Sequence, residues 1–184
     1  MEGWTLVMQI RGDRILLRNI EEKDIEFLRQ MINDKELSQM TVGESSYVSK
    51  IKQQIWFKNL KNEKNKIRFM IDTIEGTIGT IILGNIDNKN KSASIGIKIG
   101  KADFKGKGFG TETIKTILPY IFEELNLNRI YANVLEYNTP SKNMFMKCGF
   151  NIDGVQRQAI YKNEKFYDLI ILSILRKDFN NNGK

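Results

Sequence analysis

The stretch KGKGFGT, residues 105–111, lies directly after a run of β-branched residues and directly before an amphipathic helical pattern. A glycine-rich turn in that position can direct several backbone N–H groups and the positive end of the helix dipole toward a phosphate. Glycine lets the backbone approach the phosphates without a Cβ and permits positive φ values, while Lys105 and Lys107 add positive charge. The stretch therefore predicts an anion-binding turn at the start of a helix.

Two other phosphate-binding motifs do not fit this stretch. The P-loop needs four residues between its first glycine and a Gly-Lys-Ser/Thr run, and a dinucleotide-binding fold needs an early βαβ unit. Neither the spacing nor the context is present.

The chain before this turn predicts a strand, two helices and three strands. Residues 14–19 read as a strand, and apolar residues at helical spacing predict helices around 27–32 and 51–60, with a loop over 34–48 between them. From residue 66 the period changes to short β-branched runs separated by turn residues, which predicts three antiparallel strands ending near residue 100.

The chain after the turn predicts a helix, a strand, a second helix and two strands. Residues 111–125 place their apolar side chains on one helical face, and Pro119 should bend that helix. Residues 129–135 read as a strand and 139–147 as a helix, and strands resume at Phe150. We expect one domain over 1–184, with a frayed tail over 179–184.

The composition excludes several classes of site and compartment. The 184-residue chain has no histidine, so zinc and Ser-His-Asp chemistry are not expected, and its one cysteine, Cys148, cannot form an internal disulfide. No apolar run approaches the roughly 20 residues of a membrane helix, and the start lacks a signal-peptide core, which predicts a cytoplasmic protein. A net charge of +7 is compatible with an anionic partner or with compositional bias alone.

A second motif lies near the end of the predicted strand 129–135 and in the helix that follows it. Asn138 follows a predicted strand, Ser141 comes three residues later, and the short helix ends in Lys147, Gly149 and Phe150. Alone this is a well-capped helix. Together with the glycine-rich turn, and in the same order, it resembles the Gcn5-related N-acetyltransferase (GNAT) family over residues 14–177. It looks closest to the branch of ribosomal-protein, polyamine and amino-sugar acetyltransferases.

The resemblance implies an α/β (α+β) fold with a mixed, mostly antiparallel sheet of about seven strands and about four helices. It further implies that the fourth and fifth strands splay apart to hold acetyl-CoA, the co-substrate, with no metal. By position, the family's cofactor-binding residues correspond to Ile97, Lys98, Ile99, Lys105, Gly106, Lys107, Gly108, Phe109, Gly110, Thr111, Asn138, Ser141 and Lys147.

The chain departs from the family where many members carry a general acid. Phe145 stands in place of a tyrosine that protonates the leaving thiolate, and phenylalanine cannot donate a proton. Water or Tyr137 are the alternatives. With histidine absent, Glu136 is the first candidate for the general base, and Glu75 and Glu112 are less direct ones.

The expected acceptor is a primary amine on a small molecule, such as an amino sugar or polyamine, or a protein N-terminus. The absence of an obvious base slightly favours an amine of low pKa. The loop 34–48 and the segment 157–167 should select the acceptor, with its candidate contacts at Trp56, Tyr47, Arg157 and Tyr161. A catalytically silent CoA binder and a basic RNA- or ribosome-binding module are the alternatives. Nucleic acid and membranes are not the expected partners, and a homodimer is an open alternative to a monomer.

Overall fold

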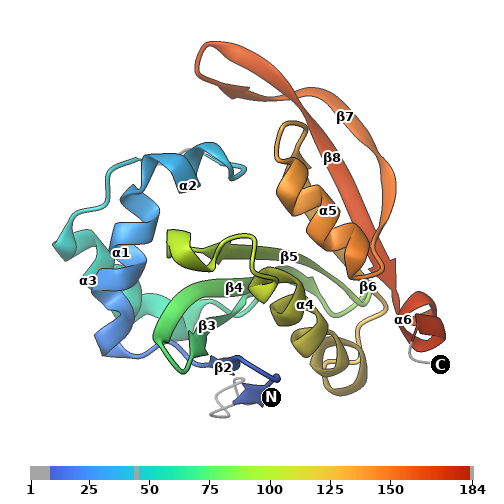
Figure 1. Ribbon diagram of the computed structural model, residues 1–184, viewed down its shortest axis with the longest axis horizontal. Helices are drawn as coiled ribbons and strands as arrows, with labels where there is room; N and C mark the ends of the chain where they lie inside the picture. Colours follow the sequence, from blue (N-terminus) through green and yellow to red (C-terminus); the bar gives the residue numbers. More distant parts are fainter. Residues whose placement is uncertain (1–8, 44–45, 183–184) are drawn as a thin grey trace.

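The computed structural model describes residues 9–43 and 46–182, and an eight-stranded mixed sheet forms its centre (Figure 1). The sheet order is β1-β2-β3-β4-β5-β6-β8-β7, and only the β5–β6 pair is parallel. The strands are β1 (Ile10–Arg11), β2 (Leu16–Arg18), β3 (Ile67–Thr73), β4 (Gly76–Asp87), β5 (Ser92–Ile99), β6 (Arg129–Leu135), β7 (Asn151–Lys162) and β8 (Lys165–Leu175).

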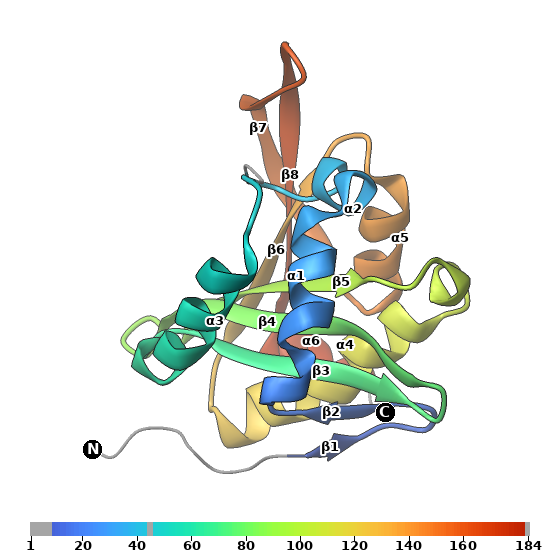
Figure 2. The same ribbon diagram turned by 90° about the vertical axis from the view of Figure 1, so that its left-hand side faces the viewer.

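Helices cover the sheet and its ends. Figure 2 shows α1 and α3 on the side of β3 and β4, and the β7–β8 ribbon extending away from the rest of the sheet. The α-helices are α1 (Ile25–Asn33), α2 (Lys35–Gln39), α3 (Lys50–Asn59), α4 (Phe109–Pro119), α5 (Thr139–Lys147) and α6 (Arg176–Asn182). No helix within residues 9–43 and 46–182 is long and apolar enough to span a membrane.

The parallel pair β5–β6 separates along its length. Backbone pairing joins Ser92, Ala93 and Ser94 to residues 129–131 and then stops, although both strands continue. β6 instead pairs with β8 along its whole length. The far halves of β5 and β6 therefore diverge, as the family resemblance implied.

Helix α4 supplies much of the core. Ile114 and Ile117 of α4, and Ile121 in the turn that follows it, are fully buried and join the main apolar cluster of the sheet. The α-helix ends at Pro119, and the chain continues as one π-helical turn, Tyr120–Glu124, closed by a 3.0 Å bond from Leu125 N to Tyr120 O. The sequence predicted a bend at Pro119, whereas the structure shows a change from α- to π-helical bonding there; proline removes an N–H donor from the helical ladder.

A buried ion cluster fixes the start of α1 to the sheet. The Arg18 guanidinium on β2 is 6% exposed and donates to Asp24 at 2.6 and 2.8 Å and to Asp72 on β3 at 2.6 Å. Burial raises the pKa of Asp24, but hydrogen bonds from Arg18 and from the Glu21 backbone outweigh it, so the pKa lies below its ordinary value.

The predicted number of elements is too small in three places. The described residues form eight strands and six α-helices, not seven and four, because β1, α2 and α6 are additional. β1 has two residues and α2 five, too short to show a hydrophobic period. The predicted frayed tail is helical to Asn182, where Phe179 packs on Phe122 with ring centroids 5.1 Å apart.

Candidate active site

The glycine-rich turn forms an open backbone concavity at the start of α4. Gly106 and Gly108 have φ values of 75° and 86°, which favour glycine, and Gly108 caps the helix. A Cβ added at Gly106 would meet no atom within 4 Å. Lys105 and Lys107 are exposed beside it. Free helix-terminal N–H groups, positive φ values and nearby lysines suit an anion such as a pyrophosphate.

Arg14 holds this turn from the segment between β1 and β2. Its guanidinium bonds to Glu112 on α4 at 2.7 Å, lies 4.4 Å from the centre of the Phe109 ring and donates to the Lys107 carbonyl at 3.4 Å. Glu112, one of the less direct base candidates, is therefore paired with a guanidinium. This pairing also offsets the one acidic side chain in the first turn of α4.

The turn leads directly to the gap between β5 and β6. A Cβ at Gly110 would lie 2.7 Å from Met144 Sδ on α5 and 4.0 Å from Ile97 Cδ1 on β5, so α4 approaches both elements here. The gap holds a cavity of about 180 Å³, which we call the splay cavity. Its lining residues are Thr41, Val42, Thr80, Ile82, Ile95, Gly96, Ile97, Lys98, Asn133, Ser141 and Phe145.

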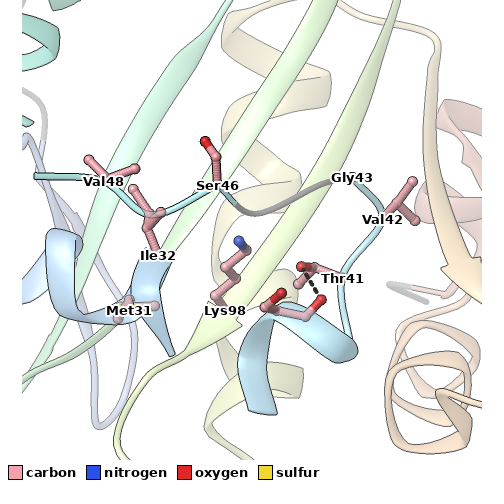
Figure 3. Close-up of a pocket in the computed structure, with 9 residues that line it drawn as sticks. Met31, Ile32, Thr41, Val42, Gly43, Ser46, Val48 and Lys98 are labelled. Atoms are coloured by element: carbon pink, nitrogen blue, oxygen red, sulfur yellow. Dashed lines mark hydrogen bonds between the residues drawn. The ribbon is translucent and has the colours of Figure 1, made fainter. Parts of the chain in front are cut away.

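A second cavity of about 170 Å³ adjoins the first, and we call it the loop cavity. Thr41, Val42 and Lys98 line both cavities. Figure 3 shows the Lys98 side chain pointing from its strand into the space between Ile32 and Thr41. The loop cavity is lined by Met31, Ile32, Ser38, Thr41, Val42, Gly43, Ser46, Val48 and Lys98.

Three side chains from the other half of the molecule hold the segment 38–41 in place. Tyr137 Oη donates to the Gln39 carbonyl at 2.6 Å, and Asn138 Nδ2 donates to the Met40 carbonyl at 2.8 Å. Lys162 Nζ donates to the carbonyls of Ser38 at 2.5 Å and Thr41 at 2.6 Å. The end of β6 and the end of β7 thus fix one wall of the loop cavity.

The predicted cofactor-binding residues fall into three groups. Residues 105–111 form the concavity, while Ile97, Lys98 and Ser141 line the splay cavity. Asn138 caps α5 through its side-chain oxygen, which accepts from Ser141 N at 3.1 Å, so its amide faces the helix and the segment 38–41. Ile99 packs against the core, and Lys147 is exposed at the end of α5.

Neither candidate catalytic residue lines the splay cavity or the loop cavity. Glu136 is exposed and accepts a 3.0 Å bond from the Asp168 backbone N–H. The Tyr137 hydroxyl donates a hydrogen bond to the Gln39 carbonyl, and burial raises the pKa of Tyr137. Phe145 is 3% exposed, lines the splay cavity and packs on Phe150 with centroids 5.0 Å apart.

The four candidate acceptor contacts also lie outside the cavity linings. Trp56 lies under the Arg68 guanidinium at 5.5 Å from the ring centre. Tyr47 is 72% exposed, although its neighbours Ser46 and Val48 line the loop cavity. Arg157 is exposed on β7, and Tyr161 packs on Phe166 at 4.8 Å.

The lining residues that were not singled out come from strands, from the predicted loop and, for Met31 and Ile32, from helix α1. Thr80, Ile82 and Asn133 gave no signal, because each is an ordinary strand residue in the sequence. Thr41 and Val42 lie within the loop 34–48 that was assigned to acceptor selection, and Lys162 lies within the segment 157–167. Their segments were therefore predicted but the residues were not.

Comparison with known proteins identifies the family of this chain. The family model described as Acetyltransferase (GNAT) domain matches residues 14–151. The chain belongs to the GNAT acetyltransferase family. Members transfer an acetyl group to an amine, and this chain is an N-acetyltransferase. Within residues 9–43 and 46–182, no group of three or more Cys, Asp or Glu side chains is arranged to hold a metal.

Similar GNAT proteins cover nearly the whole chain. It is 30% identical over 171 residues to the N-acetyltransferase p20 of Bacillus licheniformis, covering 91% of this chain and 96% of that one. It is 34% identical over 174 residues to YoaA of Bacillus subtilis, with the same coverage. Spermidine N-acetyltransferase of Vibrio cholerae, solved with CoA and spermine, has a TM-score of 0.84 and 26% identity, covering 91% of this chain and 99% of that one.

Proposed function

We propose that the donor is acetyl-CoA and that the acceptor is a primary amine on a small molecule, with a protein N-terminus as the second acceptor class. The observation that carries this proposal is the glycine-rich turn at the start of α4 together with the cavity between the diverging strands β5 and β6, to which α4 comes close at Gly110. Acetyl-CoA supplies an acetyl group activated as a thioester. The CoA complex of the structurally similar spermidine N-acetyltransferase supports this donor.

Different residues of the chain bind different parts of acetyl-CoA. The backbone N–H groups of residues 106–111, with Lys105 and Lys107, bind the pyrophosphate. The unpaired edge of β5 from Ile97 to Ile99 hydrogen-bonds the pantetheine arm, because its partner strand has diverged. Ser141 and Phe145 border the acetyl group in the splay cavity.

The acceptor amine enters through the loop cavity. This cavity shares Thr41, Val42 and Lys98 with the splay cavity, so an amine in one can reach an acetyl group in the other. No carboxylate lines either cavity among the described residues. An amine that is already neutral is therefore the expected substrate. At pH 7 a lysine-like amine of pKa about 10.4 costs about 4.6 kcal/mol to deprotonate, against about 1 kcal/mol for an α-amine of pKa about 7.8.

Two roles follow for the candidate catalytic residues. Tyr137 positions the segment 38–41 through Gln39, and Glu136 holds the β6–β8 edge through the Asp168 N–H. Protonation of the leaving thiolate is assigned to water, since Phe145 has no proton to give and the Tyr137 hydroxyl already donates to the Gln39 carbonyl.

The pH dependence of kcat/KM tests the predicted low pKa of the acceptor amine. A kcat/KM that does not rise above about pH 8 would support an acceptor of low pKa, whereas a continued rise would contradict it.

The donor is tested by thermal unfolding with acetyl-CoA, CoA and ATP at equal concentrations. Ligand at 100 times its Kd adds about 2.7 kcal/mol of stability, roughly 5 to 10 °C for a chain of this size. We expect both CoA forms to raise the Tm and ATP to have little effect, and thiol release to follow when amines are added. Equal shifts with all three ligands, or none, would refute the donor assignment. Binding without thiol release from any amine would instead favour the silent binder.

A further inference from the structure

Lys98 is a cation at the junction of the two cavities. Its side chain is half-buried, lines both cavities and points into the loop cavity in Figure 3. Among the described residues no carboxylate forms an ion pair with it. Burial, followed by the charge of Lys162, lowers its pKa below the ordinary lysine value. The ammonium group is therefore destabilised until a ligand compensates its charge.

Lys162 places a second positive charge beside the same cavity. Its ammonium group donates to the backbone carbonyls of Ser38 and Thr41, so it neutralises no acidic side chain among the described residues. The other lining residues are apolar or carry small hydroxyl groups. A partly desolvated cation gains most from an anion that it can hydrogen-bond, and like charges nearby strengthen that preference.

A cavity of this kind disfavours a polyamine. Each further ammonium group of a polyamine would lose hydration near Lys98 and Lys162 without meeting a carboxylate among the described lining residues. An amine that also carries a carboxylate or phosphate gains a charge-assisted hydrogen bond instead. The structurally similar spermidine N-acetyltransferase was solved with spermine, so this charge pattern points to a different acceptor class for this chain.

We propose that Lys98 determines acceptor specificity by binding an anionic group, a carboxylate or a phosphate, that the acceptor carries near its amine. This inference rests on the proposed acetyl transfer and deepens it. It makes Lys98 a residue that contacts substrate, in addition to the contact of its backbone with the pantetheine arm.

Matched pairs of acceptors test the proposal, because each pair differs in the anionic group. Glucosamine 6-phosphate is compared with glucosamine, and glycylglycine with glycylglycine amide, with spermidine as the polycation. Thiol release from acetyl-CoA gives kcat/KM for each. We expect the anionic member of at least one pair to be preferred by about 10- to 100-fold, the factor that one charge-assisted hydrogen bond provides. The pair that responds distinguishes phosphate from carboxylate.

Variants connect the preference to Lys98. Lys98→Met should bring the preference close to one, and Lys98→Arg should retain most of it, because the positive charge is kept. Lys66→Met is the matched control, since Lys66 is exposed before β3 and outside both cavity linings. An unchanged Tm shift with CoA shows that each variant is folded. Binding can also be measured without turnover, using CoA, which has no acetyl group to transfer. The preferred acceptor should then raise the Tm of the CoA-bound wild type but not that of CoA-bound Lys98→Met.

Four outcomes would overturn the proposal. Spermidine as good as or better than the anionic acceptors would refute it, and so would a preference that survives in Lys98→Met. Equal loss of turnover for all acceptors in Lys98→Met and Lys98→Arg would make Lys98 a general base instead. Glu44 lies outside the described residues, so Glu44→Gln joins the panel, and spermidine turnover that depends on it would also refute the proposal. If wild type turns over no amine at all, the proposed acetyl transfer itself fails.

Discussion

Replacing Gly108 with alanine separates ligand binding at the turn from backbone strain. Gly108 has φ of 86° and caps α4, and a Cβ there would lie 3.5 Å from Arg14 Nη2, an ordinary contact. The cost to folding therefore comes from the left-handed backbone rather than from a clash. That cost is about 1 to 2 kcal/mol, which lowers the Tm of a chain of this size by about 2 to 8 °C.

The effect on CoA binding should be larger than the effect on folding. The added methyl group would stand where the pyrophosphate approaches the backbone N–H groups, and relaxation of the turn would misdirect them. Losing one hydrogen bond to a charged group costs about 1.5 to 3 kcal/mol, or about 10- to 150-fold in Kd. Isothermal titration calorimetry with CoA measures this directly.

Gly76→Ala is the matched control for this experiment. Gly76 has φ of 99° at the β3–β4 turn, and a Cβ there would meet nothing within 4 Å. It carries comparable strain and is not one of the residues 105–111, so its Tm should fall similarly while its Kd for CoA stays at the wild-type value. Equal Kd values for Gly108→Ala, Gly76→Ala and wild type would refute the assignment of the pyrophosphate to this turn.

The remaining predictions concern stability, reactivity and the segment 38–41. Arg18→Met should lower the free energy of unfolding by about 3 to 5 kcal/mol in urea titrations, because it leaves Asp24 buried without its partner; a loss below about 1 kcal/mol would contradict this. In the wild type the pKa of Asp24 is lowered, so its contribution is full above the ordinary value of about 3.9 and is lost as the pH falls through the lower folded value. Urea titrations between about pH 2.5 and 6 should show that decline, and stability that rises on acidification would be inconsistent with it. Burial raises the pKa of Cys148 to about 11, so at about pH 8 a thiol reagent should react about 100-fold or more slowly with the native protein than in urea; equal rates would show the thiol to be accessible. Tyr137→Phe should raise the acceptor KM by about 2- to 10-fold through the lost bond to Gln39, with CoA binding unchanged. Turnover that instead falls by about two orders of magnitude at constant KM would make Tyr137 the general acid.

The parts of the fold that follow from the sequence are those with long, local patterns. Helix α4 was predicted from its apolar face and from the glycines before it, and the order of the predicted elements along the chain was correct because it needs no distant contact. β1 and α2 were missed because they are too short to show a hydrophobic period, and α6 was missed because it depends on a partner elsewhere in the chain. α2 begins where the Asp34 side chain accepts from Leu37 N at 3.1 Å, and α6 depends on the packing of Phe179 against Phe122.

The candidate site likewise has a part that follows from local sequence and a part that depends on distant contacts. The turn at residues 105–111 is made of consecutive residues, so seven adjacent residues were enough to predict a glycine-rich turn at the start of a helix. The loop cavity is closed by bonds between residues far apart in the chain, such as Lys162 and Ser38, separated by 124 positions. Glu136 and Tyr137 have suitable chemistry, but their side chains bond to the backbone of Asp168 and Gln39, which no sequence pattern reveals.

The bonds to segment 38–41 connect the two proposed substrate sites through Asn138. The carbonyls at the end of α2 accept hydrogen bonds from three side chains, contributed by the β6–α5 connection and by β7. The family motif places its asparagine at position 138, yet here the side-chain nitrogen binds Met40 while the oxygen caps α5 beside Ser141. One amide therefore touches the wall of the loop cavity and the helix that borders the splay cavity. A change at Asn138 should consequently alter the acceptor KM together with CoA affinity, whereas a change at Lys162 should act mainly on the acceptor.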